Sequence, residues 1–478
     1  MTRGIGTRSA WAAVGVVVVS AAAVALTSTA DPQRATVDAS SQTVPTSRAQ
    51  LSCPESTTAK GVTTSLLAVT PPSDDTGNDD SGSGSLDVRR LSTEQQPVAD
   101  VDQVGTPIAT VLGSDAQPSV TVDASGSAAP AAYAAQRTSL DAGQRGGLAV
   151  APCLPSGDTW WFTGVDTSVG STSRLVLSNP APAVAAVDLT FYGPQGIKAA
   201  VGARGIPIAP QSRLSLDLAR FAPGPDAFAV RVHATRGRVS AAVDVARVNG
   251  VTANGNEWLA PSQPPDTDIV VNAGDAGPGD QQLVITNPSA REALVQVQVL
   301  DTSGPFTPKD LADLRIKPGR TVVKDVSSVT GASAAALRVT TEQEDSTVIA
   351  TLVSESATGP VDLATSSSSA PLTGPAVVPV FTDTRLALSF AGTTPGGSAQ
   401  IQAYDDQGDP VGDAERVGVK PRTTVTWSKT PSPGTAYLVV TADGLPGDVT
   451  YHGPTGLSSM PLLSGSTTVT RPAVQPAS

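Results

Sequence analysis

The stretch RLVLSNPAPAVAAVDLTFYG at residues 174–193 decides the fold class of this chain. A second copy, QLVITNPSAREALVQVQVLD at 282–301, begins 108 residues later, and a looser third copy begins with RLALSF at 385–390. Solenoid and propeller units are usually much shorter than one hundred residues, so this period predicts tandem domains.

Side chains alternate in character along each copy. Val187, Leu189 and Phe191 would face one side of a strand, and Asp188 and Thr190 the other. A period of two with one polar face is typical of antiparallel sheet. Glycine and proline turn signals recur between these runs, so the sequence predicts an all-β protein of tandem antiparallel β-sandwich repeats, immunoglobulin-like in shape.

The composition of the chain changes along its length and suggests domain boundaries. The region between the two cysteines contains strand-like runs and one alanine-rich segment, 128–140, that could form a helix. We expect a signal peptide or transmembrane anchor at 1–30, a flexible stalk at 31–50, a disulfide-closed β-rich region at 51–157, sandwich repeats at 158–250, 251–358 and 373–463, a linker at 359–372 and a disordered tail at 464–478.

The N-terminus has the pattern of an export or membrane segment. Arg3 and Arg8 precede an uncharged run from 9 to 29, which is long enough to span a bilayer as a helix. The positive charges before the run place the rest of the protein outside the cytoplasm. We therefore expect an extracytoplasmic protein, either anchored in the membrane by one span or secreted after cleavage of a signal peptide.

Charge and cysteine content limit the function classes. The 478 residues carry a formal net charge of −12, which argues against a nucleic-acid partner because such proteins show basic surfaces. The only two cysteines are Cys53 and Cys153, both in the part expected outside the cytoplasm. In an oxidising compartment they are expected to form one disulfide.

The stretch PCLPSGDTWWF at 152–162, followed by the repeats, resembles a family of actinobacterial exported proteins that is catalogued only as a domain of unknown function. The resemblance covers about 50–460, and the third copy departs from it because Ser389-Phe390 stands where the first two have Asn-Pro. It implies a cell-envelope location and a β-rich fold, and it implies no activity or site residue.

No catalytic constellation is evident in the sequence. The chain has only two histidines, and His233 falls on the polar face of an alternating strand, as a surface residue would. Asp217, Asp244 and Glu257 are the carboxylates that a glycosidase could use, but Asp217 and Asp244 alternate with core residues. We therefore expect no enzymatic activity, no cofactor and no catalytic residue, and keep an envelope hydrolase as a remote alternative.

Two acidic loops, 74–80 and 405–409, are dense enough in carboxylates to suggest calcium sites. Neither has the EF-hand register, since Pro410 occupies the glycine position of the second loop and Arg416 its final glutamate position. The second loop is better explained as a hairpin turn. We therefore expect no metal site.

Aromatic residues are sparse, and the pair Trp160-Trp161 is the main cluster. These tryptophans are a candidate platform for a sugar ring, and the alternative is that they pack in the first repeat and at its junction with a neighbour. The sequence favours a non-catalytic envelope scaffold or protein-interaction module. A protein that binds cell-wall or capsule carbohydrate is the alternative, so the expected partner is an envelope protein or glycan.

Overall fold

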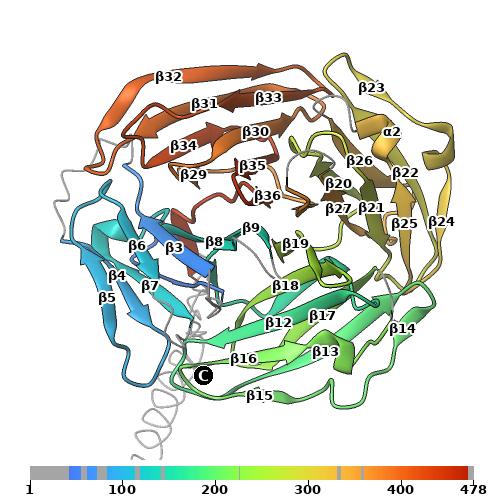
Figure 1. The fold of residues 1–478 in the computed structure, drawn as a ribbon, viewed down its shortest axis with the longest axis horizontal. Helices are drawn as coiled ribbons and strands as arrows, with labels where there is room; N and C mark the ends of the chain where they lie inside the picture. Colours follow the sequence, from blue (N-terminus) through green and yellow to red (C-terminus); the bar gives the residue numbers. More distant parts are fainter. Residues whose placement is uncertain are drawn as a thin grey trace, which may run out of the picture. The chain divides into compact units, whose positions relative to one another are not determined.

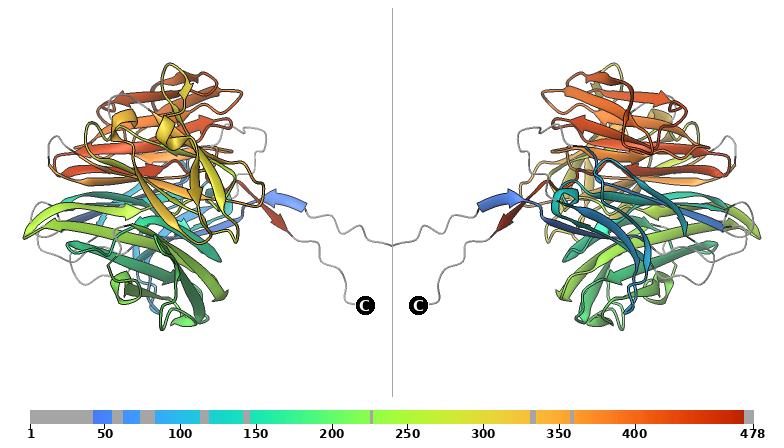
Figure 2. Two further views of the ribbon diagram at one scale, coloured as in Figure 1. Left: turned by 90° about the vertical axis from the view of Figure 1, so that its right-hand side faces the viewer. Right: turned by 90° about the vertical axis from the view of Figure 1, so that its left-hand side faces the viewer.

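The computed structural model describes residues 42–54, 62–72, 83–112, 119–140, 146–224, 227–330, 335–356 and 360–471. Contacts divide the chain into a compact unit of residues 45–468 and a second unit of residues 1–44 and 469–478. At the ends of the described chain, β1 (Gln42–Pro45) pairs with β37 (Thr468–Arg471) (Figure 2).

The large unit consists of four antiparallel β-sandwiches, numbered 1 to 4 in chain order (Figure 1). Each sandwich has an outer sheet and a four-stranded inner sheet, and the four inner sheets have the same strand order relative to the chain. The expected fold class, all-β with tandem antiparallel sandwiches, is therefore confirmed.

Sandwiches 1 and 2 contain β2 to β19. The outer sheet of sandwich 1 has the order β10 (Leu154–Pro155), β2 (Arg48–Ser52), β7 (Val120–Ser125), β4 (Ser85–Arg90), β5 (Pro97–Val101), and its inner sheet β6 (Ile108–Leu112), β3 (Val62–Val69), β8 (Tyr133–Leu140), β9 (Gly147–Pro152), with the 3-10 turn η1 (Gly126–Ala128). The outer sheet of sandwich 2 has the order β11 (Thr159–Val165), β17 (Phe228–Arg236), β13 (Ala185–Gly193), β14 (Gly196–Lys198), with β15 (Ile206–Ile208) also on β13, and its inner sheet β16 (Ser212–Asp217), β12 (Ser171–Asn179), β18 (Ser240–Asn249), β19 (Thr252–Leu259), with η2 (Leu218–Arg220).

Sandwiches 3 and 4 contain β20 to β36. The outer sheet of sandwich 3 has the order β20 (Asp268–Asn272), β26 (Ala336–Thr341), β22 (Ala293–Leu300), β23 (Pro305–Phe306), with β24 (Leu314–Ile316) also on β22, and its inner sheet β25 (Thr321–Asp325), β21 (Gln281–Thr286), β27 (Ile349–Glu355), β28 (Leu363–Ser367), with η3 (Lys309–Leu311) and α2 (Ser327–Thr330). The outer sheet of sandwich 4 has the order β29 (Ala376–Pro379), β34 (Tyr437–Ala442), β31 (Gly397–Tyr404), β32 (Pro410–Val419), and its inner sheet β33 (Thr424–Lys429), β30 (Arg385–Ala391), β35 (Gly447–Gly453), β36 (Gly456–Pro461).

The last strand of each inner sheet lies at the centre of this unit. β9 contacts β19 and β36, and β28 contacts the same two strands, so the four sandwiches form a closed ring (Figure 1). The region between the cysteines is thus a sandwich like the other three. Its copy of the motif, TTSLLAV at 63–69, ends in four consecutive buried apolar residues, which cover both faces of the inner sheet, so alternation did not reveal it.

Closure between sandwiches 4 and 1 is largely apolar. Leu67 and Leu148 of sandwich 1 belong to the same buried cluster as Leu388 of sandwich 4. The hydroxyl of Tyr437 donates to the carbonyl of Gly105 at 2.7 Å, which ties the two sandwiches at their outer edge. Burial of apolar surface on both faces of the inner sheet stabilises the closed arrangement.

Three expectations about the sandwiches need correction. The segment 128–140 is not a helix: β8 occupies Tyr133–Leu140. Its alanines favour a helix in isolation, but in a sheet packed closely on both faces a small side chain fits. The boundary expected at 250–251 falls before β19, which pairs with β18. The linker expected at 359–372 contains β28, the last strand in the inner sheet of sandwich 3.

None of the helices in the described part of the chain is long and apolar enough to cross a membrane. The expected signal peptide or anchor at 1–30 and residues 31–41 of the expected stalk lie outside the described residues. The rest of the expected stalk contains β1 and the first residues of β2, and the tail expected to be disordered contains β37, so both expectations are wrong at these residues.

Candidate functional site

Four backbone N–H groups converge on one carboxylate at the centre of the ring. Oδ1 of Asp362 accepts hydrogen bonds from the N–H groups of Asn256 at 3.0 Å and Leu363 at 2.8 Å. Oδ2 accepts from the N–H groups of Leu148 at 2.9 Å and Leu457 at 3.0 Å. These four donors lie in β9, β19, β28 and β36, so a single side chain ties all four sandwiches together.

Glycine makes room for this side chain. Gly147, Gly255 and Gly456 precede the other three donors, as Asp362 precedes Leu363. A Cβ atom on Gly456 would lie 1.8 Å from Oδ2 of Asp362, and one on Gly147 would lie 2.6 Å from Oδ1. The centre therefore holds one aspartate and three glycines at equivalent positions.

A second carboxylate lies near the first. Oε1 of Glu257 accepts from the N–H of Trp258 at 2.9 Å and the hydroxyl of Ser458 at 2.8 Å, and Oε2 accepts from the N–H of Ser459 at 3.1 Å. Burial raises the pKa of Asp362 to about 7, against the effect of its hydrogen bonds. Burial, with a smaller effect of the Asp362 charge, also raises the pKa of Glu257 well above its usual range.

This carboxylate pair is a structural tie. Asp362 and Glu257 are both 0% exposed, whereas a hydrolase needs its two acids in a cleft that admits substrate. Glu257 is paired with Val245 across the two strands, so these two side chains share a face of the sheet. Asp244 precedes Val245 in its strand and therefore points to the opposite face. Asp217 is exposed and caps η2 by accepting from the N–H of Ala219 at 3.0 Å, so the three carboxylates considered from the sequence do not converge.

The two histidines have other partners than the carboxylates described above. Nδ1 of His233 lies 3.1 Å from the hydroxyl of Thr159 on the neighbouring strand. Nε2 of His452 lies 3.6 Å from the carboxylate of Asp275.

Trp161 packs at the junction between sandwiches 2 and 3. It is 8% exposed and lies in a cluster with Tyr192, Ala229 and Ile349, the last from sandwich 3. The rings of Trp161 and Tyr192 are 5.6 Å apart, and the guanidinium of Arg231 lies over the indole at 5.5 Å from the ring centre. The indole is thus enclosed by the protein itself.

Trp160 packs partly against the core of sandwich 2, and its indole N–H donates to the carbonyl of Val239 at 2.8 Å. A sugar platform formed by Trp160 and Trp161 remains a prediction, but a stacking platform requires an accessible ring face, and the burial of Trp161 does not favour one.

Cys53 and Cys153 are joined by a disulfide, which confirms the expected pairing. Cys53 follows β2 of the outer sheet, and Cys153 follows β9 of the inner sheet. The bond therefore joins the two sheets of sandwich 1 next to a strand that carries a hydrogen-bond donor to Asp362.

The acidic loop at 405–409 is the turn of the β31–β32 hairpin. Oδ1 of Asp405 accepts from the N–H groups of Gln407 and Asp409, both at 2.9 Å. The other acidic loop, at 74–80, lies outside the described residues. Within the described part of the chain, no group of three or more His, Cys, Asp or Glu side chains could hold a metal ion.

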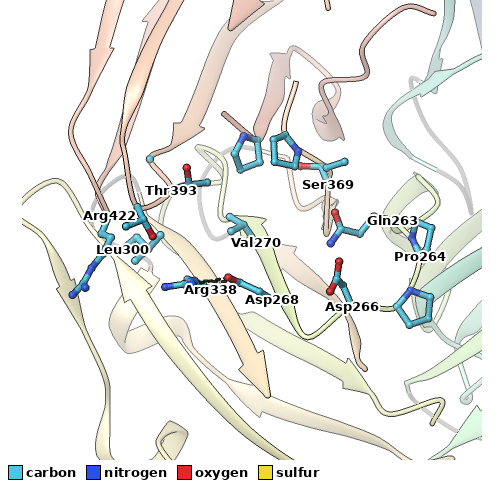
Figure 3. Close-up of a pocket in the computed structure, with 16 residues that line it drawn as sticks. Gln263, Pro264, Asp266, Asp268, Val270, Leu300, Arg338, Ser369, Thr393 and Arg422 are labelled. Atoms are coloured by element: carbon cyan, nitrogen blue, oxygen red, sulfur yellow. Dashed lines mark hydrogen bonds and ion pairs between the residues drawn. The ribbon is translucent and has the colours of Figure 1, made fainter. Parts of the chain in front are cut away.

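A pocket of about 470 Å³ lies between sandwiches 3 and 4 and is the candidate functional site (Figure 3). Its lining comes from the segment before β20, from sandwich 3, from the connection to sandwich 4, and from turns of sandwich 4. The lining residues are Gln263, Pro264, Pro265, Asp266, Asp268, Val270, Leu300, Arg338, Ser369, Ala370, Pro371, Gly392, Thr393, Thr394, Arg422 and Pro446.

The pocket combines an apolar part with a paired charge. Val270 and Leu300 belong to the buried cluster between the two sandwiches. Nε and Nη2 of Arg338 donate to the two oxygens of Asp268 at 2.8 and 2.6 Å, and this pairing raises the pKa of Arg338. Figure 3 shows this ion pair beside Val270, with Asp266 and Gln263 on one side and Arg422 on the other. A preformed pocket of this size, with an apolar part beside several polar groups, suits a ligand or a partner side chain.

Sequence reasoning missed both Asp362 and this pocket. Asp362 falls in the segment expected to be a linker. The signal that could have found it is the series Gly147-Leu148, Gly255-Asn256, Asp362-Leu363 and Gly456-Leu457 at equivalent places in the repeats.

Comparison with protein families gives a match over residues 108–429 to a family described as "Family of unknown function (DUF5719)". The chain belongs to this family. Its match begins at β6 in sandwich 1 and ends with β33 in sandwich 4, so it includes parts of all four sandwiches. The family resemblance noted in the sequence is therefore confirmed, and family membership carries no activity.

Other comparisons add little. No curated protein matches the chain. Among solved structures, one titled "Biofilm associated protein - BSP domain" is similar at 9% sequence identity, with 88% of this chain and 96% of that chain covered. Its TM-score is 0.14, which is too low to support an argument about fold or function.

Proposed function

We propose that this protein is a non-catalytic interaction module of the cell envelope, a scaffold that binds another envelope protein through the pocket between sandwiches 3 and 4. The pocket carries this proposal, because it joins an apolar surface, Val270 and Leu300, to the ion pair of Asp268 and Arg338 on strands β20, β22 and β26 of one sheet. Preformed pockets with a few convergent polar groups are the usual binding sites of proteins.

The location outside the cytoplasm is supported by two features. Arg3 and Arg8 precede the uncharged run at 9–29, as in exported or anchored proteins. The disulfide between Cys53 and Cys153 fits an oxidising compartment, where such bonds persist.

The burial of the central carboxylates supports a non-catalytic role. Asp362 and Glu257 have raised pKa values, a property common in active sites, but both are enclosed and bonded to backbone N–H groups of the ring. Raised pKa values also arise in structural networks, and we assign these two residues to stability.

Site-specific photo-cross-linking in the producing cell tests the proposal. A photoreactive phenylalanine analogue is placed at Thr394, which is exposed on the pocket rim, and at Val201, which is 99% exposed in sandwich 2, as the matched control. We expect one envelope protein to be cross-linked from position 394 and not from position 201. Recovery of wall polysaccharide without protein from position 394 would replace this proposal with the carbohydrate-binding alternative.

A further inference from the structure

The junction between sandwiches 2 and 3 and the junction between sandwiches 3 and 4 have the same backbone framework. In each, an edge strand of the outer sheet places one residue opposite an arginine: Trp161 opposite Arg231 in the first junction, and Val270 opposite Arg338 in the second. The carbonyl of Trp161 accepts from Ser262 N–H at 2.9 Å, and that of Val270 from Ser369 N–H at 3.3 Å.

A second pair of hydrogen bonds repeats across the junctions. The hydroxyl of Thr321 donates to the carbonyl of Tyr192 at 2.6 Å, and the hydroxyl of Thr424 donates to the carbonyl of Leu300 at 2.7 Å. Trp161 therefore corresponds to Val270, and Tyr192 to Leu300.

The side chains at these matched positions differ in size. The first junction is filled by the rings of Trp161 and Tyr192, whereas the second has Val270 and Leu300 in their places. Both rings are replaced by branched aliphatic groups, and the pocket of about 470 Å³ lies where the second junction lacks them. The pocket is thus the counterpart of a space that an indole occupies elsewhere in the same molecule.

The cation that stacks on this indole is kept. Arg231 lies 5.5 Å from the ring centre of Trp161, an arrangement that stabilises an aromatic ring beside a cation. Arg338 has the matched position and lines the pocket, and Asp268 holds its guanidinium by two hydrogen bonds. Because Asp268 neutralises Arg338, the wall beside Val270 carries no net charge, which suits a neutral planar ring.

We propose that the pocket receives a tryptophan side chain from an extended segment of the partner protein. This deepens the proposed function and rests on it, since it names the group that the partner presents. The indole would lie against Val270 and Leu300 beside Arg338, as Trp161 lies beside Arg231. Gln263 and Asp266 on the rim face the pocket with groups that can bond to the backbone of the segment (Figure 3).

Binding of N-acetyl-L-tryptophanamide to the purified protein tests this inference. Methyl NMR spectra of Val270 and Leu300 are followed during titration, with N-acetyl-L-leucinamide as the matched probe. We expect saturable shifts of these methyl groups with a dissociation constant on the order of 0.1–1 mM, as for a ligand of this size, and at least about tenfold weaker binding of the leucine probe. No shift at about 10 mM, or equal response to both probes, would overturn the inference.

Two variants are measured, so that the inference can still be tested if one of them fails to fold. V270W/L300Y installs the residues of the filled junction and is expected to abolish the shift of the remaining pocket residues on addition of the probe. Trp161→Ala empties the filled junction, and we expect it to bind about one additional equivalent of the tryptophan probe, as engineered apolar cavities bind aromatic molecules. Binding by V270W/L300Y as strong as by the wild type would contradict the placement of the ligand.

The two proposals can fail separately. A protein cross-linked at position 394, together with no response to the tryptophan probe, retains the interaction module and rejects the tryptophan. Binding of the probe without any cross-linked protein rejects the proposed partner while leaving the pocket chemistry in place.

Discussion

Substitution of Gly456 by alanine is expected to break the central tie of the ring. The new Cβ would lie 1.8 Å from Oδ2 and 2.6 Å from Cγ of Asp362, so the carboxylate must move. Oδ2 then loses the N–H groups of Leu148 and Leu457. Two buried backbone donors would lack an acceptor in two different sandwiches.

The magnitude follows from these contacts. A buried donor without an acceptor costs about 1–3 kcal/mol, so two cost about 2–6 kcal/mol. Gly456 has a φ of 154°, where a Cβ adds about 1–3 kcal/mol of backbone strain. The central values add to about 6 kcal/mol. With about 2.1 cal/mol/K per residue of unfolding entropy over residues 45–468, this corresponds to a fall of roughly 7 °C in the unfolding midpoint.

Calorimetry of four proteins measures the effect: the wild type, G456A, D362G and the double variant. Without the carboxylate, the G456A change meets no clash, so in the D362G background it should cost only the backbone strain, about 2 °C. Gly196→Ala is the matched control, because Gly196 also opens the second strand of a hairpin and has a φ of 113°, but a Cβ atom added there would meet no other atom within 4 Å.

Two results would refute this reasoning. The first is a G456A midpoint no lower than that of G196A, which would mean that the clash with Asp362 is absorbed without loss. The second is an equal effect of G456A with and without Asp362, which would mean that the two positions are not coupled.

Two further predictions concern stability. Replacing both Cys53 and Cys153 by serine should lower the free energy of unfolding by about 4–5 kcal/mol in the chain-entropy model, because the bond closes a loop with a sequence separation of 100; calorimetry with and without a reductant checks this, and a wild type insensitive to reduction would contradict it. The second concerns pH: burial raises the pKa of Asp362 from 3.8 to about 7, so between about pH 4 and pH 7 the folded state holds a proton that the unfolded chain has released. At 1.36 kcal/mol per pKa unit, the free energy of unfolding should fall by about 4 kcal/mol as the pH rises through this window and then level off, and D362G should lose this contribution. A wild-type midpoint that increases with pH between 5 and 7 would be inconsistent with the burial of Asp362.

The antiparallel sandwich fold could be predicted because it depends on local patterning. In 186–193, apolar and polar residues alternate, and β13 follows that pattern with core residues Val187, Leu189 and Phe191 on one face. The runs expected between the cysteines also occur as strands, such as β3, β4 and β9. The disulfide could be predicted because the chain has two cysteines and an export-like N-terminus.

Sandwich 1, between the cysteines, and the boundaries at β19 and β28 could not be derived in the same way. The alanine-rich strand β8 has the composition of a helix, and only its packing between two sandwiches explains its conformation. β28 lies in a serine-rich segment that resembles a linker, yet its serines are buried at the centre of the ring. Local propensity is a weak guide where tertiary contacts surround a strand on both faces.

The sequence by itself determined the sheet type, the repeat period, the disulfide and the family, since each depends on residues close together or on a simple count. Only the tertiary structure decided that four sandwiches close into a ring, that Asp362 bonds to N–H groups in all four, and that Val270 and Leu300 line a pocket where the matched junction has Trp161 and Tyr192. The physical reason is that these features arise from contacts between segments far apart in the chain. Their geometry depends on which faces of different sandwiches meet, and alternation within one strand does not specify this.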